Sequence, residues 1–238
     1  MRARSEGRDS ARGAPPPPGG FSPRAEASRY GRYVGVIGLV IVVLITLNTV
    51  LTKSRAGAGI APGERVPPFA VPLATGTLEG DANFAVRPNE GSAGQRAACT
   101  VVGARILNIC QLYERGPVVL ALFVNSGSCA HVLDRLRALA PQFPGVSFAA
   151  VAIRGDRRAL RALVRARAPN IPVGFDRDGA LVSLYKMISC PQITLAEPGG
   201  TVQSRALLEL PSLATLRARV AALEASARRH HGWSPPGR

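Results

Sequence analysis

The sequence predicts an α/β domain in which a central mixed sheet is flanked by helices, preceded by one transmembrane helix. Two apolar runs, at residues 117–124 and 146–153, are typical of strands buried on both faces. Leucines recur at helical spacing after the first run and again after the second. Near the N-terminus, residues 34–52 carry no charge and are dominated by Val, Ile and Leu. Buried strands joined through helices pair in parallel by right-handed crossovers, which gives an α/β sandwich.

The uncharged run at 34–52 is long enough for the transmembrane helix, which we place at residues 33–52. About 20 helical residues span the ~30 Å hydrocarbon layer of a bilayer. Seven arginines precede the run, and only Lys53 and Arg55 follow it closely. This bias predicts a single-pass protein of the cell membrane with a cytoplasmic N-terminus and an extracytoplasmic folded domain. The alternative is a cleaved signal peptide with its cleavage site at 56–58, although the apolar core of a signal peptide is normally shorter.

Composition divides the chain into further segments around this helix. Residues 1–32 contain four consecutive prolines at 15–18 and are predicted to be a disordered cytoplasmic tail. Residues 53–65 are small and rich in Gly and Ala, which favours a flexible linker. We expect the folded domain at 66–229 and a disordered polar tail at 230–238.

Within the domain, the pattern predicts each element in turn. The expected order is an extended lead-in at 66–78, a loop at 79–105, an apolar segment of undecided type at 106–112, a strand at 117–124, a helix at about 129–140, a strand at 146–153, a helix capped by Asp156, a short strand at 171–175, a turn at 176–179, a short helix at 180–185, a strand at 192–196, a hairpin turn at 197–200, a return strand at 201–204, and a final helix carrying Leu213, Leu216, Val220 and Leu223.

The formal charge of +15 invites a nucleic-acid interpretation, which other features oppose. The basic residues are nearly all arginine and are spread over the tail, the middle and the C-terminus. Aromatic residues make up only 5% of the chain, so few bases could be stacked. We therefore expect arginines on solvated helix faces, with some attraction to anionic lipid, and no nucleic-acid partner.

Several segments in this order resemble the thioredoxin-like, or redoxin, superfamily. Residues 117–139 form an apolar strand, a Cys-bearing turn and a helix, and residues 175–180 resemble a segment of membrane-anchored thiol-disulfide oxidoreductases and thiol-specific antioxidant proteins. Residues 190–194 and 199–202 are similar to the cis-proline loop and β-hairpin of that superfamily, and 66–69 is similar to its lead-in. The resemblance covers roughly residues 64–227 and implies a thioredoxin-like fold in an extracytoplasmic thiol-disulfide oxidoreductase.

The sequence departs from this superfamily at the position of its C-x-x-C motif. Residues 125–132 have the sequence NSGSCAHV, so the motif is degenerate and holds one cysteine. Cys129 matches the first cysteine if Val132 replaces the second, or the second cysteine if Ser126 replaces the first. Both alignments stay open, and the dithiol cycle within a single motif is not available to this chain.

Of the four cysteines, Cys99 and Cys110 precede the first core strand and are 11 residues apart. A bridge between them would close a short loop, and in an oxidising compartment two free buried thiols are the less favoured alternative. We expect a structural disulfide that staples a region with little regular structure. The resemblance places Cys129 at the start of the first core helix and Cys190 in the loop that faces it, and so predicts the second pair.

The resemblance also implies roles for the second pair. Cys129 and Cys190 are the candidate catalytic residues, and Pro191 is the candidate substrate-binding residue. Cys129 is the expected attacking sulfur, because unpaired N–H groups at a helix N-terminus stabilise a thiolate. His131 could add to this effect as an imidazolium, although a solvent-facing helix residue is the favoured interpretation.

Three functions are compatible with these residues. The first is a membrane-tethered thiol-disulfide oxidoreductase that uses Cys129 with Cys190 on a thiol-bearing or disulfide-bearing protein substrate. The second is a non-catalytic binding module whose disulfides are structural, and the third is a thiol peroxidase, which is disfavoured because the peroxidatic signature is absent before Cys129. His230 and His231 lie in a polar segment and no Cys/His spacing matches a zinc site, so no metal and no cofactor are expected.

Overall fold

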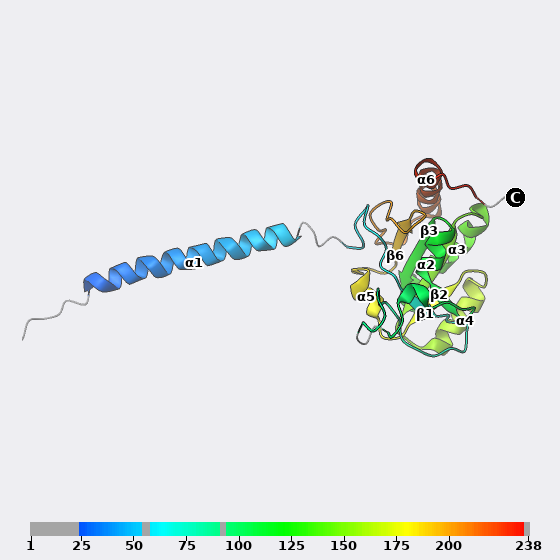
Figure 1. The fold of residues 1–238 in the computed structure, drawn as a ribbon, viewed down its shortest axis with the longest axis horizontal. Coiled ribbons are helices and arrows are strands. Elements are labelled where there is room, and N and C mark those ends of the chain that lie inside the picture. The colour runs from blue at the N-terminus through cyan, green and yellow to red at the C-terminus, as the bar shows by residue number, and fades with distance from the viewer. Residues whose placement is uncertain (1–23, 54–57, 91–93, 236–238) are drawn as a thin grey trace, which may run out of the picture. The chain divides into compact units, whose positions relative to one another are not determined.

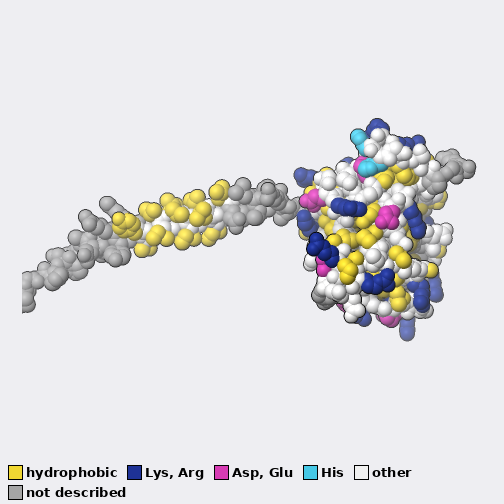
Figure 2. Space-filling model, in the orientation of Figure 1, with side chains coloured by type: hydrophobic (Ala, Val, Ile, Leu, Met, Phe, Trp, Pro, Cys, Tyr) yellow, Lys and Arg dark blue, Asp and Glu magenta, His cyan; other side chains and the backbone are white. Residues whose placement is uncertain are grey.

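The computed structural model describes residues 24–53, 58–90 and 94–235, and it divides into two units, residues 1–55 and 56–238. In the first unit, helix α1 (Arg24–Lys53) includes the predicted membrane-spanning run, and its side chains are described at residues 31 and 33–47. Apolar side chains on this stretch are exposed all along it, as Figure 2 shows on the visible face. Among the residues that the structure describes, no helix combines the length and apolar character needed to cross a membrane. Of the disordered tail predicted at 1–32, residues 1–23 lie outside the described residues. From Arg24 onward the chain is part of helix α1.

The second unit is built on a four-stranded mixed sheet with the order β5-β4-β3-β6 (Figure 1). The strands are β3 (Val118–Phe123), β4 (Ser147–Ile153), β5 (Val173–Asp176) and β6 (Gln192–Ala196). The first three are parallel, and β6 runs antiparallel to β3. Every residue of β3 is buried, which explains why the strand is an unbroken apolar run rather than an alternating one.

Each face of the sheet packs against its own layer. Alternate residues of β3 divide between two hydrophobic clusters, with Val119, Ala121 and Phe123 in one and Val118, Leu120 and Leu122 in the other. The first cluster is completed by helices α3 (Val132–Leu139), α4 (Arg157–Arg167) and α6 (Leu213–His231).

The second cluster, on the other face of the sheet, is completed by α2 (Ile109–Arg115) and α5 (Ala180–Leu184). A two-stranded antiparallel ribbon, β1 (Ala70–Pro72) with β2 (Ile106–Asn108), also packs there. Short 3₁₀ turns occur at Ala98–Thr100, Gly127–His131 and Ala140–Gln142.

Side-chain caps fix where several helices begin. The Asp156 carboxylate accepts a hydrogen bond from the Ala159 N–H at 2.6 Å and so starts α4, as the sequence predicts. Ser212 starts α6 in the same way, by accepting from the Thr215 N–H. Asn108 starts α2 by accepting from the Cys110 N–H at 2.9 Å, so the undecided segment at 106–112 is the short strand β2 followed by the start of α2.

The structure also corrects four details of the sequence-based prediction. The residues around Cys129 form a 3₁₀ turn, and the α-helix begins only at Val132. Residues 58–65 of the expected linker pack on the domain, where Ile60 is buried in the core. Helix α6 continues to His231, past the boundary expected at 229, because a Glu197 oxygen binds His231 Nε2 at 2.8 Å. The return strand at 201–204 is reduced to isolated bridges.

Candidate redox site

The structure joins Cys129 and Cys190 in a disulfide. The two residues are 61 positions apart in the chain, and their Cα atoms lie 5.5 Å apart. Cys190 precedes Pro191 through a cis peptide bond, so the loop has the form that the resemblance implies. The pairing is the one expected from the sequence, and it spans two segments instead of lying within one C-x-x-C motif.

The register of the sheet explains why these two segments meet. Leu122 near the end of β3 pairs with Gln192 at the start of β6, and the two strands run in opposite directions. The turn that leaves β3 and the loop that enters β6 therefore lie at the same end of these two strands. Cys129 is in the first and Cys190 in the second, so a bond between them needs no change in either strand.

A single backbone donor serves both sulfurs. The Val124 N–H donates to Cys190 Sγ at 3.1 Å and to Cys129 Sγ at 3.4 Å. An N–H donor stabilises a thiolate in preference to a thiol, because the anion is the stronger acceptor. The site therefore holds a group that would stabilise the negative charge released when the disulfide opens.

The two cysteine residues differ in exposure. Cys129 is 6% exposed and belongs to the hydrophobic cluster of α3, α4 and α6. Cys190 is partly exposed and packs against the edge of that cluster. Two residues before Cys190, Ile188 is 72% exposed. The residues just before Cys129, Ser126 to Ser128, are also exposed. The site is accessible to a partner mainly through Cys190.

The helix-terminus argument for Cys129 is weakened by the local geometry. Cys129 lies three residues before the first residue of α3, within a 3₁₀ turn whose N-cap residue Ser126 makes no side-chain capping bond. The turn begins at Gly127, which has a φ of +52°. That angle lies in the left-handed region favoured by glycine, so the chain turns there before the α-helix starts. The hydrogen bond described to Cys129 Sγ comes from the Val124 N–H, directly after β3, and not from α3.

His131 is exposed, as the favoured interpretation of the sequence holds, and its ring is bound away from the disulfide. Arg167 Nη1 donates to His131 Nδ1 at 2.7 Å and to Asp134 Oδ2 at 2.8 Å. The same His131 Nδ1 lies 3.2 Å from Asp134 Oδ2. No contact described for His131 reaches either sulfur, and the ring is part of a surface network between α3 and α4.

Asp176 is a buried carboxylate at the end of β5, the strand farthest from β6 in the sheet. Burial raises the pKa of Asp176, although hydrogen bonds from the Leu181, Gly179 and Ala180 N–H groups act to lower it. These three bonds organise the turn that begins α5. The carboxylate is therefore committed to the fold, and among the described residues no group of three His, Cys, Asp or Glu side chains could hold a metal ion.

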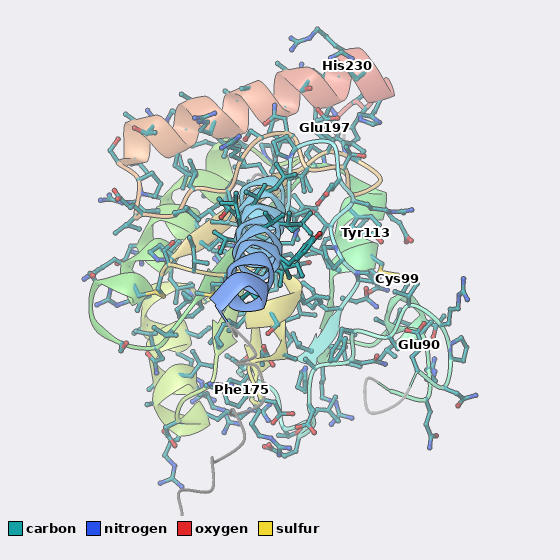
Figure 3. The ribbon with its side chains drawn as sticks, turned by 90° about the vertical axis from the view of Figure 1, so that its left-hand side faces the viewer. Glu90, Cys99, Tyr113, Phe175, Glu197 and His230 are labelled. Carbon is teal, nitrogen blue, oxygen red and sulfur yellow. A yellow bond between two sulfur atoms is a disulfide. The ribbon has the colours of Figure 1, made fainter. Side chains whose placement is uncertain are left out.

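The second disulfide joins Cys99 and Cys110, whose Cα atoms lie 5.4 Å apart. Cys110 is 1% exposed in the cluster of α2 and α5, on the opposite face of the sheet from Cys129. Cys99 is exposed, and its Sγ lies 3.8 Å from the Tyr113 hydroxyl (Figure 3). This pair occupies the irregular region that the sequence predicts it to staple.

Asn108 supports the same region and was not identified from the sequence. It is 2% exposed, and its Nδ2 donates to the Ala98 and Val101 carbonyls at 2.8 and 2.9 Å. Because it also accepts from the Cys110 N–H, the Asn108 side chain hydrogen-bonds near both cysteines of the Cys99–Cys110 disulfide. The sequence held one local signal, an Asn at the N-cap position before an apolar segment, but the bonds to the Ala98 and Val101 carbonyls lie ten and seven residues away.

Comparison with solved structures shows which fold the domain has. A candidate thiol:disulfide interchange protein DsbE from Chlorobium tepidum matches with a TM-score of 0.51 and 15% identity, over 69% of this chain and 98% of that one. A candidate protein disulfide isomerase from Bacteroides thetaiotaomicron matches with a TM-score of 0.53 and 11% identity, over 74% and 99%. The domain has a thioredoxin-like fold.

A secreted disulfide oxidoreductase of Mycobacterium tuberculosis, described as homologous to E. coli DsbE, shares 24% identity over 50% of this chain and 90% of that one, with a TM-score of 0.45. No protein-family model matches the sequence, and no curated protein matches it. The fold, with its strand–turn–helix unit, cis-proline loop and hairpin, is the one that the sequence resemblance implies.

Proposed function

We propose that this protein is a membrane-tethered, extracytoplasmic thiol-disulfide oxidoreductase whose redox-active pair is Cys129 and Cys190. The observation that carries the proposal is the disulfide between these residues, which shares the Val124 N–H between its two sulfurs. The bond lies outside the strands and helices that form the sheet and its layers. It can therefore open and close without breaking any hydrogen bond of the sheet.

The reaction is an exchange of thiols and disulfides. One thiolate of a dithiol substrate attacks one sulfur of the pair, the bond between Cys129 and Cys190 breaks, and the other protein sulfur leaves as a thiolate. The second thiolate of the substrate then attacks the substrate sulfur of the mixed disulfide. The substrate leaves oxidised by two electrons, the protein is left as a dithiol, and the reverse sequence reduces a substrate disulfide.

The surface beside the disulfide favours a protein substrate. Ile188 projects from the loop before Pro191, and an open depression is lined by residues 206–212. That segment is tied to the loop, because Ser189 donates to the Leu208 carbonyl and Leu207 pairs with Ile193. We propose that Pro191 and this segment hold an extended stretch of the substrate beside Cys190.

The membrane tether is supported by α1 and its sequence. Residues 34–52 are uncharged, and this run extends past residue 47, where the described side chains of α1 end. The described apolar side chains between Tyr33 and Leu47 are about half exposed or more. Burial of such side chains in lipid would be favourable, and the seven preceding arginines favour a cytoplasmic N-terminus.

The catalytic proposal is tested with the full chain in detergent, by measuring insulin reduction with glutathione as the reductant. We expect the wild-type protein to accelerate the reaction and the Cys129→Ser and Cys190→Ser variants to fall to the uncatalysed rate. A Cys99→Ser/Cys110→Ser variant is the matched control and should keep most of the activity. Equal activity in the wild type and both single variants would contradict the proposal.

A non-catalytic binding module is the second candidate, favoured by the burial of Cys129. It predicts no rate acceleration by the wild-type protein. The orientation is tested separately, with a reporter active only outside the cytoplasm fused after Arg238. A silent reporter on a well-expressed fusion would contradict the extracytoplasmic placement, whatever the activity of the domain.

A further inference from the structure

We propose that Cys190, and not Cys129, is the sulfur that forms the mixed disulfide with the substrate, while Cys129 is the resolving sulfur. This order rests on the proposed function, and it reverses the order that the sequence favours. In the sequence, Cys129 precedes a helix and Cys190 precedes a proline. In the structure, the surroundings of the two sulfurs point to the opposite roles.

The first argument is access. Thiol-disulfide exchange needs the attacking sulfur and the two sulfurs of the disulfide to approach along a line, so the attacked sulfur must face the partner. Cys129 is 6% exposed and lies within the hydrophobic cluster that also contains Ala130 and Val132. Cys190 is partly exposed, in a loop whose neighbour Ile188 projects into solvent. A protein substrate would meet Cys190 first.

The second argument is the position of the Val124 N–H. In the disulfide this donor lies 3.1 Å from Cys190 Sγ and 3.4 Å from Cys129 Sγ. In the reduced protein, the nearer sulfur gains more from the donor, which favours the thiolate at Cys190. Burial in an apolar cluster acts against a thiolate at Cys129, because desolvation disfavours the charged form.

The same donor serves the second half of the cycle. When the Cys190 thiolate attacks a substrate disulfide, a bond forms between Cys190 Sγ and the substrate, and the other substrate sulfur leaves as a thiolate. Cys190 is then neutral, and the Val124 N–H is free to serve Cys129. The Cys129 thiolate, after its proton passes to solvent, attacks Cys190 Sγ and expels the second substrate sulfur. The substrate has then gained two electrons, and the bond between Cys129 and Cys190 has formed again.

The proposal is tested with the full chain in detergent, using variants that each keep one sulfur of the pair. Reduced Cys129→Ser, which keeps Cys190, and reduced Cys190→Ser, which keeps Cys129, are mixed with oxidised glutathione, and the glutathione adduct is followed by intact mass. We expect the adduct to form on Cys129→Ser at least tenfold faster than on Cys190→Ser. Equal rates, or a faster rate on Cys190→Ser, would overturn the assigned order.

A second measurement avoids the substitutions. The reduced wild-type protein is treated with less than one equivalent of iodoacetamide over a range of pH, and the alkylated cysteine is identified by peptide mass spectrometry. We expect alkylation at Cys190 and a reactivity that persists to lower pH than that of a free thiol. Predominant alkylation at Cys129 would contradict the order. If neither variant forms an adduct while both remain folded, the proposed function itself fails.

Discussion

The two disulfides are alike in exposure and differ in their surroundings. Each joins a more exposed cysteine to a buried one, since Cys99 is exposed and Cys110 buried, and Cys190 is partly exposed and Cys129 buried. Attack at the accessible sulfur would expel the buried sulfur in both cases. At the Cys129–Cys190 bond, the expelled sulfur has the Val124 N–H within reach. At the Cys99–Cys110 bond, the Cys110 N–H is already bound to Asn108 and the sulfur lies in an apolar cluster.

We infer from this difference that the surroundings of the leaving sulfur, more than those of the exposed one, distinguish the proposed redox-active bond from the proposed structural bond. Both buried cysteines lie in apolar clusters, which disfavours a thiolate, so the difference between the two bonds is the Val124 N–H beside Cys129. The secondary structure around the two disulfides differs as well. Cys129 and Cys190 follow and precede strands of the central sheet, whereas Cys99 lies in a segment with one short 3₁₀ turn.

The largest expected effect on stability is at the Cys129–Cys190 bond. A Cys129→Ala/Cys190→Ala variant opens a loop of 61 residues, and the chain-entropy model assigns about 4 kcal/mol to a closure of that size. Small domains have free energies of unfolding of about 5–15 kcal/mol, so the variant should stay folded but be clearly less stable. Urea unfolding followed by circular dichroism measures this loss. An unfolded variant would mean that the bond is required for the fold.

The next effect is at the Cys99–Cys110 bond. A Cys99→Ala/Cys110→Ala variant opens a loop of 11 residues, for which the same model gives about 3 kcal/mol. Because Asn108 still holds the segment, we expect the loss to fall below that value. Amide hydrogen exchange should show faster exchange confined to residues near the segment. Faster exchange in the β3–β6 pairing instead would contradict the local role.

Removal of Asn108 sharpens the comparison further. Asn108→Ala removes the side-chain partner of the Ala98 and Val101 carbonyls and of the Cys110 N–H, at a cost of about 2 kcal/mol, although the Ala98 carbonyl still accepts from the Val101 N–H. In the protein that also lacks the Cys99–Cys110 bond, the same substitution should cost a different amount, because both interactions order one segment. A double-mutant cycle measures the coupling, with Thr215→Ala on α6 as the distant control. Strict additivity would show that the two interactions act independently.

These cases show what sequence patterns can and cannot predict. The apolar run at 117–124 predicts β3 because a strand buried on both faces leaves no polar position, and the strand at 192–196 was predicted with its observed bounds. The cap at Asp156 was predicted because its partner is three residues away. The extension of α6 was missed because its partner is distant, since Glu197 lies 34 residues from His231. Asn108 has a local partner in the Cys110 N–H, but its bonds to the Ala98 and Val101 carbonyls span ten and seven residues.

The site shows the same limit. The resemblance brought Cys129 and Cys190 together, and the structure has that pair. The sequence favoured Cys129 as the attacking sulfur from its place before a helix, but it could not show that a 3₁₀ turn intervenes or that the sulfur is buried. Exposure and the direction of a backbone N–H depend on tertiary packing, and these are the features that distinguish the two sulfurs.

The smallest expected effect is a pH-dependent one, away from both disulfides. Burial acts to raise the pKa of Glu197, but hydrogen bonds from Ser226 and His231 and the nearby charge of His230 and His231 lower it below its ordinary value of 4.5. A depressed acid pKa stabilises the fold above that ordinary value, and the stabilisation is lost as the pH falls through the folded-state pKa. Glu197→Gln should therefore be less stable than the wild type near neutral pH, with the difference shrinking in acid. An undiminished difference at about pH 3 would contradict this linkage.

The central claim is that the Cys129–Cys190 bond is redox-active and the Cys99–Cys110 bond is not. The most direct test equilibrates the full chain in glutathione buffers of graded potential, traps the thiols, and maps both disulfides by mass spectrometry while circular dichroism follows the fold. We predict that Cys129–Cys190 opens at a potential above about −300 mV with the fold intact, while Cys99–Cys110 stays closed there. Opening of Cys99–Cys110 first, or opening of Cys129–Cys190 only as the circular dichroism signal is lost, would contradict the account.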